Sequence, residues 1–167
     1  MACPSEYATL SRHDMSRQPT DTDYHRLLEF RTSLRRFLHW SEQQAHAQDL
    51  TAAQHQLLLA IKGHPGAAGP SIGDVAGYLL LRHNSAVGLI DRAEAKGLVR
   101  RTIDPHHRRT TRLTLTEDGA QRLEALSELH LQEVPRLAST MRALFEDLND
   151  HDPAEASSRL APRSEAD

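Results

Sequence analysis

Two arginines, Arg108 and Arg109, stand between two short runs of β-type residues in the segment Leu98–Leu115. The pattern predicts a β-hairpin whose tip carries both guanidinium groups. An arginine on a narrow hairpin can enter the minor groove of DNA, where the negative potential is enhanced. The tip therefore favours contact with nucleic acid, and the alternative is a pair of solvated loop arginines.

The charge of the chain is distributed unevenly. Residues 82–112 hold eight arginines and lysines but three acids, a local charge of +5, whereas the rest of the chain carries −8 and the whole chain −3. A protein that is acidic overall can still present one cationic surface to phosphates. The alternative, a solvated charged surface without a ligand, stays open on charge alone.

A helix is predicted immediately before the hairpin, over residues 84–96. Val87, Ile90 and Ala93 recur at helical spacing as its inward face, and Gly97 is placed to end it. Side chains at the start of a helix in the major groove can reach base edges, and the alternative role for such residues is helix capping. The predicted DNA contacts of this helix and the hairpin are Arg82, His83, Asn84, Ser85, Val87, Gly88, Arg92, Arg108 and Arg109.

Three more helices are predicted on the amino-terminal side. Apolar residues at helical spacing indicate a first helix over about 23–47. The segments Thr51–Gln54 and Ser71–Asp74 have the spacing of capping boxes, which begin a short second helix and a third that runs to about Leu80. Two short helices joined by a tight turn, the second followed by a hairpin, are in the order of a winged helix-turn-helix.

After the hairpin, Thr116 begins a long amphipathic helix. Pro135 is expected to end or kink it, so that a last helix covers about 136–149. The terminal helices have more apolar surface than a compact centre of this size can cover, and a homodimer is therefore predicted. The side chains expected to pair are Phe37, Leu126, Leu144 and Phe145.

The composition indicates a mostly α fold in which the hairpin is the only substantial sheet, because β-branched and aromatic residues are few. No apolar run approaches the roughly 18 residues of a membrane span, and the amino terminus lacks the order of a signal peptide, so a cytoplasmic location is expected. Cys3 is the single cysteine, which excludes an internal disulfide. Residues 1–21 and 151–167 are expected to be a flexible arm and tail around a domain of residues 22–150.

The chain resembles the MarR family of transcriptional regulators over about residues 24–150. The resemblance is carried by four segments in order, Leu50–Leu58, Leu89–Val99, Asp104–Arg109 and Leu113–Gly119. It implies a homodimer built by terminal helices of about 23–47 and 117–149, a winged helix-turn-helix of about 50–116 in each subunit, and pseudo-palindromic sites in double-stranded DNA. A small-molecule inducer near the junction of the two regions is also common in the family.

The chain departs from the family pattern at two places. Family recognition helices often carry a polar or basic residue where Val87 and Gly88 stand, so fewer side chains are expected to read bases here. The family wing often has Asp in the place of His107, and that Asp commonly fixes the wing arginine, which Arg109 matches. The rigidity of the wing is therefore expected to differ.

His39, Trp40 and His55 lie where the resemblance places inducer pockets, and they could hold a small aromatic or anionic effector. Trp40 is equally compatible with an ordinary core or dimer contact. Eleven histidines leave a metal-sensing regulator of the same fold open, although none has helical metal-ligand spacing.

No catalytic motif is recognised, and neither an enzyme activity nor a cofactor is predicted. The sequence predicts a homodimeric, sequence-specific DNA-binding regulator, a repressor released by a small ligand. The competing class is a winged-helix protein-interaction module that does not bind DNA.

Overall fold

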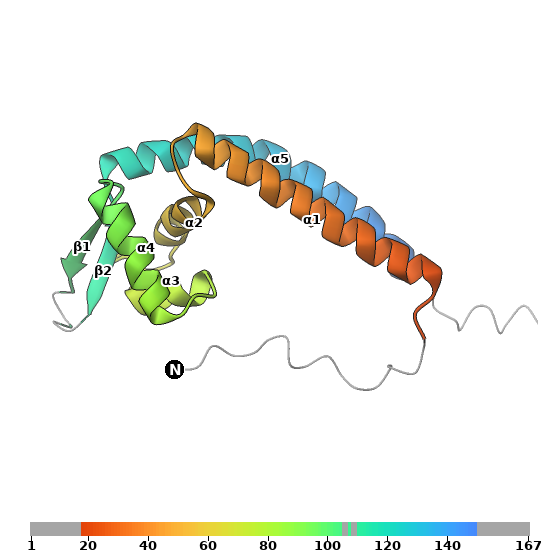
Figure 1. Ribbon diagram of the computed structural model, residues 1–167, viewed down its shortest axis with the longest axis horizontal. Helices are drawn as coiled ribbons and strands as arrows, with labels where there is room; N and C mark the ends of the chain where they lie inside the picture. Colours follow the sequence, from red (N-terminus) through yellow and green to blue (C-terminus); the bar gives the residue numbers. More distant parts are fainter. Residues whose placement is uncertain (1–17, 105–106, 108–109, 150–167) are drawn as a thin grey trace, which may run out of the picture.

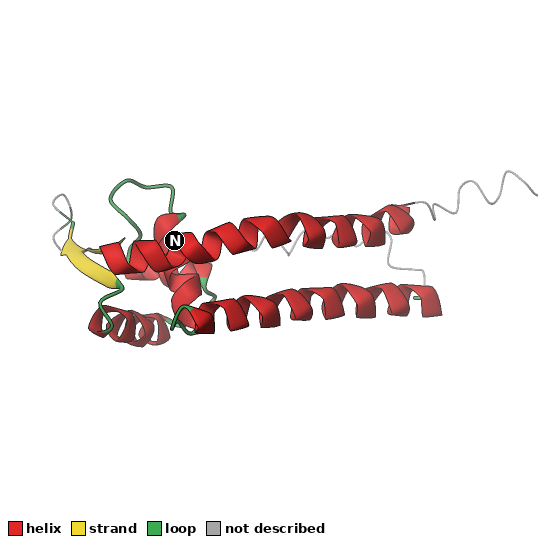
Figure 2. Ribbon diagram, turned by 90° about the horizontal axis from the view of Figure 1, so that it is seen from above, coloured by secondary structure: helices red, strands yellow, loops and turns green. Residues whose placement is uncertain are grey.

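The computed structural model describes residues 18–104, 107 and 110–149. This part of the chain is mostly helical, with one antiparallel hairpin, as the sequence predicts. Helices α1 and α5 lie side by side as long rods, and their far ends project beyond a compact unit formed by the other elements (Figures 1 and 2). The elements are α1 (Asp21–Ala47), α2 (Ala52–Lys62), α3 (Ile72–Tyr78), α4 (His83–Ala95), β1 (Val99–Ile103), β2 (Thr111–Leu115) and α5 (Glu117–Asn149).

Reciprocal hydrogen bonds begin both helices for which the sequence has a capping box. Thr51 precedes α2 and exchanges bonds with Gln54, and Ser71 precedes α3 and exchanges bonds with Asp74. Each pair satisfies two backbone donors that a helix start leaves open. The backbone hydrogen bond from Ser71 holds the pKa of the Asp74 carboxyl below its usual value. Both predicted helix starts are confirmed.

The core lies in the compact unit, where α2, α3 and α4 pack with the hairpin and the first half of α5. Leucine supplies most of it, as the low aromatic content requires. Its largest fully buried side chains are Leu50, Leu57, Leu58, Val75, Ile90, Leu98, Leu113 and Leu126.

The inward face of α4 differs in part from the predicted one. Ile90 and Ala93 are buried as expected, but Val87 is half-buried and the neighbouring buried positions are Ala86 and Leu89. The helix ends at Ala95 with Lys96 as its C-cap, and Gly97 follows with a φ of 74°, the left-handed conformation that glycine adopts at low cost.

Helix α5 is continuous through Pro135, so the expected break into two helices is wrong. The helix is bowed in Figure 1, without an interruption of the ribbon. Proline leaves the carbonyl of the residue four positions earlier without its helical donor. Pro135 and Leu131 are both exposed, and water can satisfy that carbonyl.

Helix α1 begins at Asp21, two residues before the predicted start, because Thr20 and Asp23 form a further capping box. Most of the predicted arm and the whole predicted tail lie outside the described residues. In the described part, none of the helices combines the length and the apolar character that a membrane span needs.

Candidate nucleic-acid interface and neighbouring hollows

The first turn of α4 presents polar side chains to solvent. Arg82 is the N-cap residue, with extended backbone and no side-chain capping bond. Asn84 and Ser85 follow inside the helix and therefore do not cap it, which removes the alternative role considered for them. Arg82, His83, Asn84 and Ser85 are all exposed. Four adjacent side chains are thus available at one helix end.

Gly88 and Arg92 lie one and two turns further along α4. Gly88 is half-buried, and a Cβ there would stand 3.5 Å from the Arg92 Nη1 atom, an ordinary contact distance. A larger residue is therefore sterically possible at this position. The missing side chain leaves the exposed Arg92 as the cation of this part of the helix.

The hairpin is fixed to α4 by one of its own arginines. β1 and β2 are antiparallel, with Arg101 opposite Leu113. The guanidinium of Arg101 lies 2.6 Å from the Asp91 carboxylate and 2.5 Å from that of Glu94, both on α4. Arg101 therefore orients the hairpin against the helix.

Lys96 and Arg112 also have acidic partners. Lys96 Nζ lies 2.7 Å from Asp49 Oδ2, and this hydrogen bond holds the pKa of Asp49 below its usual value. Arg112 Nε donates to Asp104 Oδ2 at 2.9 Å. Three of the eight cations counted in the basic segment are thus paired with acidic side chains of the same chain. Arg82, Arg92 and Arg100 are exposed and have no ion pair among the described residues.

The predicted wing arginines, Arg108 and Arg109, lie outside the described residues. The base of the wing is described, and Asp104 organises it. This carboxylate is buried and accepts from the His107 backbone N–H at 3.1 Å as well as from Arg112. The sequence interpretation attached wing rigidity to position 107 and missed Asp104, which the sequence marks as the single acid between Lys96 and Glu117.

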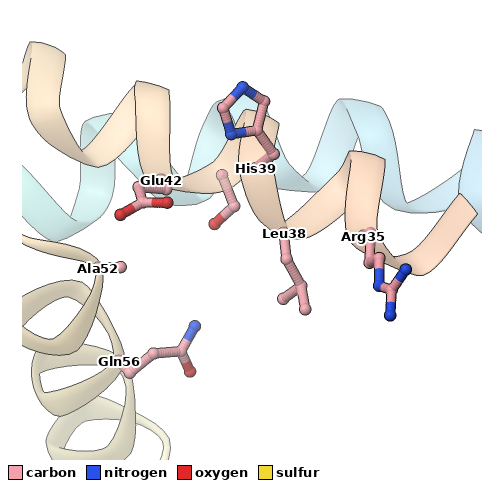
Figure 3. Close-up of a pocket in the computed structure, with 7 residues that line it drawn as sticks. Arg35, Leu38, His39, Glu42, Ala52 and Gln56 are labelled. Carbon is pink, nitrogen blue, oxygen red and sulfur yellow. The ribbon is translucent and has the colours of Figure 1, made fainter. Parts of the chain in front are cut away.

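A hollow of about 500 Å³ lies between α1 and α2. Figure 3 shows Leu38 of α1 and Gln56 of α2 extending into the space between the helices, with Arg35 at one end and Glu42 at the other. His39, one of the predicted effector residues, lines this hollow, and its Nε2 atom lies 3.1 Å from Gln43 Nε2. The full lining is Arg35, Leu38, His39, Ser41, Glu42, Ala52 and Gln56.

The other two predicted effector residues lie elsewhere. Trp40 lines a second hollow, of about 390 Å³, between α1 and α5. His55 is 3% exposed and lines neither hollow. His130 of α5 lies between them, with ring centroids 4.9 Å from Trp40 and 4.8 Å from His55. His39 therefore does not share one cavity with Trp40 and His55.

Burial in the first place, and the nearby His130 in the second, lower the pKa of His55 to about 4. His55 is therefore neutral near pH 7. The sequence interpretation missed His130, because residues 75 positions apart carry no local pattern that joins them. Among the described residues, no group of three or more His, Cys, Asp or Glu side chains is placed to hold a metal ion.

The comparisons with known proteins agree with this arrangement. Residues 48–110 match the family model described as MarR family. Over 82 residues the chain is 35% identical to the transcriptional activatory protein BadR of Rhodopseudomonas palustris. That match covers 49% of the chain and 47% of BadR, so the chain spans about half the length of this relative.

Solved structures share the fold. The S. aureus MepR–DNA complex matches with a TM-score of 0.54 at 21% identity, covering 71% of this chain and 97% of that one. Wild-type MarR of E. coli in its apo form matches with a TM-score of 0.55 at 23% identity, covering 81% and 93%. At these identities the likeness establishes the fold.

The resemblance to MarR-family winged helix-turn-helix regulators, first seen in the sequence, is thereby confirmed, and so is the predicted fold class. The family is one of transcription regulators and not of enzymes.

Proposed function

We propose that the protein is a homodimeric transcription regulator that binds a pseudo-palindromic site in double-stranded DNA through α4 and the wing. The observation that carries the proposal is the exposed first turn of α4, where four polar side chains face solvent without a capping role. A recognition helix uses this turn to reach base edges in the major groove.

The open start of α4 suits a phosphate as well as bases. A helix start leaves its first N–H groups without helical partners, and Arg82 provides no side-chain capping bond for them. Backbone N–H groups at such an end attract phosphate oxygens. The proposal therefore assigns phosphate contact to the Arg82 region and base contact to Asn84 and Ser85. Arg108 and Arg109 keep the predicted role in the minor groove.

The apolar surface of α1 supports the homodimer. Within this 27-residue helix, Ser41 and Ala45 are the buried positions of the described chain. Its large apolar side chains are mostly exposed in the single protomer, which is costly in water. They are Tyr24, Leu27, Leu28, Leu34 and Leu38. A two-fold dimer through α1 and α5 covers them and places two copies of α4 about one helical turn of DNA apart.

The hollow between α1 and α2 is the proposed effector site, because it joins a dimerisation helix to the winged-helix unit. Arg35 and His39 would favour a small anionic or aromatic compound. Such a compound releases DNA if it binds the DNA-free arrangement more tightly than the bound one. The relative BadR is named as a transcriptional activator. For this protein the proposed role is that of a repressor that the effector releases from DNA. A transcription regulator has to reach DNA, and a cytoplasmic location is therefore part of the proposal.

Selection from a library of random duplexes tests DNA binding without a known operator. We expect a pseudo-palindromic consensus and an affinity that falls as salt rises. Ser85→Ala and Asn84→Ala should each cost about 1–3 kcal/mol on the selected site. Arg109→Ala should remove most specific binding while the fold survives. Absence of any selected consensus would favour the protein-interaction alternative.

The effector site has a separate test. Phenolic acids are screened for release of the selected duplex, and active compounds are then compared on Arg35→Ala and on Arg136→Ala, which alters the hollow that contains Trp40. We expect the potency to fall in Arg35→Ala and to persist in Arg136→Ala. The reverse result would move the site to the hollow between α1 and α5.

A further inference from the structure

We propose that His55 and His130 form an acid-sensitive latch, in which proton uptake by His55, which is buried against His130, releases the first turns of α2 from α5. The two residues belong to different parts of the molecule. His55 lies in the winged-helix unit, and His130 lies on a long helix that projects from it. Their contact therefore joins the two parts.

The geometry fixes which ring nitrogen of His130 carries a hydrogen. Its Nδ1 atom lies 2.7 Å from the Leu126 carbonyl oxygen, which can only accept, so Nδ1 carries a hydrogen. Its Nε2 atom lies 2.8 Å from the Ser41 hydroxyl, which can donate or accept. His130 therefore keeps both hydrogen bonds in either protonation state.

His55 has no such freedom. Within the described residues its ring makes no hydrogen bond, and it packs against the His130 ring at a centroid distance of 4.8 Å and an interplanar angle of 53°. A proton on His55 would place a charge at a site that is 3% exposed, beside a second imidazole and with no protein acceptor among the described residues. A buried charge without a partner is strongly unfavourable. Opening of the junction, which hydrates the ring, relieves that cost.

Among the described residues, no carboxylate forms an ion pair with His55. From α1, Arg35, His39 and Glu42 line the hollow on the side of Ser41. From α5, Glu133 is paired with Arg136 at 3.3 Å in the other hollow. Burial comes first among the causes that lower the His55 pKa, and the electrostatic effect of the neighbouring His130 ring adds to it.

The sign of the pH effect follows from these values. The His55 pKa is about 4 in the closed junction and 6.5 for a hydrated imidazole, so the closed form has its full stability above pH 6.5. That stability is lost as the pH falls from 6.5 towards 4. By linkage, the population of the open form rises about tenfold between pH 7.5 and pH 5.5.

Amide hydrogen exchange of the full chain tests the latch. After correction for intrinsic exchange rates, protection of the α2 amides near His55 should fall about tenfold from pH 7.5 to pH 5.5. His55→Gln should abolish this fall, because its amide does not titrate. His46→Gln, which removes an exposed histidine of α1, should behave like the native protein.

Three results would overturn the proposal. They are a pH-independent protection of α2 in the native protein, an equal fall in His55→Gln, and an equal fall at α4 amides from Leu89 to Ala93, which would indicate general acid unfolding. If His55→Gln does not fold, His55→Met fills the same site with an uncharged side chain and serves instead. The measurement needs no DNA, so its failure is distinct from a failure of the proposed function.

Discussion

Arg100 and Arg101 are neighbours on β1 with opposite surroundings. Arg100 is exposed and has no ion pair among the described residues, whereas Arg101 is held between Asp91 and Glu94 of α4. Both contribute equally to the charge of the basic segment. Because of their positions on β1, Arg100 is available to a phosphate, whereas Arg101 holds the hairpin on α4.

The two arginines should therefore separate DNA binding from stability. Arg100→Ala should lower the magnitude of the salt slope of duplex binding by about 1 and change the free energy of unfolding by less than about 0.5 kcal/mol. Arg101→Ala should lower the free energy of unfolding by about 1 kcal/mol, because a partly exposed ion pair and a packed side-chain stem are lost. Salt titrations of binding and urea unfolding measure the two quantities. Identical profiles for the two variants would contradict the assignment.

At this scale the sequence predicted local features and missed distant ones. The pairs Thr51–Gln54 and Ser71–Asp74 could be found because capping acts between residues three positions apart. The pairing of His55 with His130 spans 75 positions and depends on how α2 packs against α5. The same reason explains why Arg101 was counted in the charge of the basic segment, although its guanidinium is paired with acids of α4.

Among the elements, α5 shows most clearly how packing changes what local propensity suggests. Gly119 stands in its first turn and Pro135 in its second half, and both are poor helix formers. Gly119 is buried against Leu98, the residue before β1. The sequence predicted that Pro135 would end or kink the helix. Pro135 lies on an exposed part of the helix, and the fold tolerates it there without a break.

Alanine at these two positions should have opposite effects. At Gly119 a Cβ would stand 2.1 Å from the Leu98 carbonyl oxygen, so the backbone must shift and the free energy of unfolding should fall by about 1–3 kcal/mol. At Pro135 alanine restores a backbone donor, and the free energy of unfolding should rise by up to about 3 kcal/mol. Urea unfolding at one protein concentration compares both variants with the native chain. A stabilised Gly119→Ala would show that the close approach to Leu98 is absent.

At the scale of the whole molecule, the long helices have two different faces. One face packs α1 against α5, where Phe37 and Trp40 meet His130. The remaining apolar side chains are exposed in the protomer, and Leu28 at 61% and Leu131 at 72% are among the most exposed. The sequence predicted more apolar surface than one chain can cover, although it named Leu126 as a dimer contact and the structure buries that residue inside the protomer.

Aspartate at Leu28 should therefore disrupt the dimer without unfolding the protomer. A buried leucine contributes about 2 kcal/mol, and two-fold symmetry counts each loss twice, so the dimer dissociation constant should rise at least about a hundredfold. Sedimentation velocity over a range of micromolar concentrations measures this change. Leu80→Asp is the matched control, because Leu80 is 93% exposed in the turn between α3 and α4 and lies away from the long helices. If Leu28→Asp and Leu80→Asp sediment alike, the exposed face of α1 is not the dimer contact. If the native protein is monomeric at these concentrations, the two-fold arrangement on which the pseudo-palindromic site depends does not form.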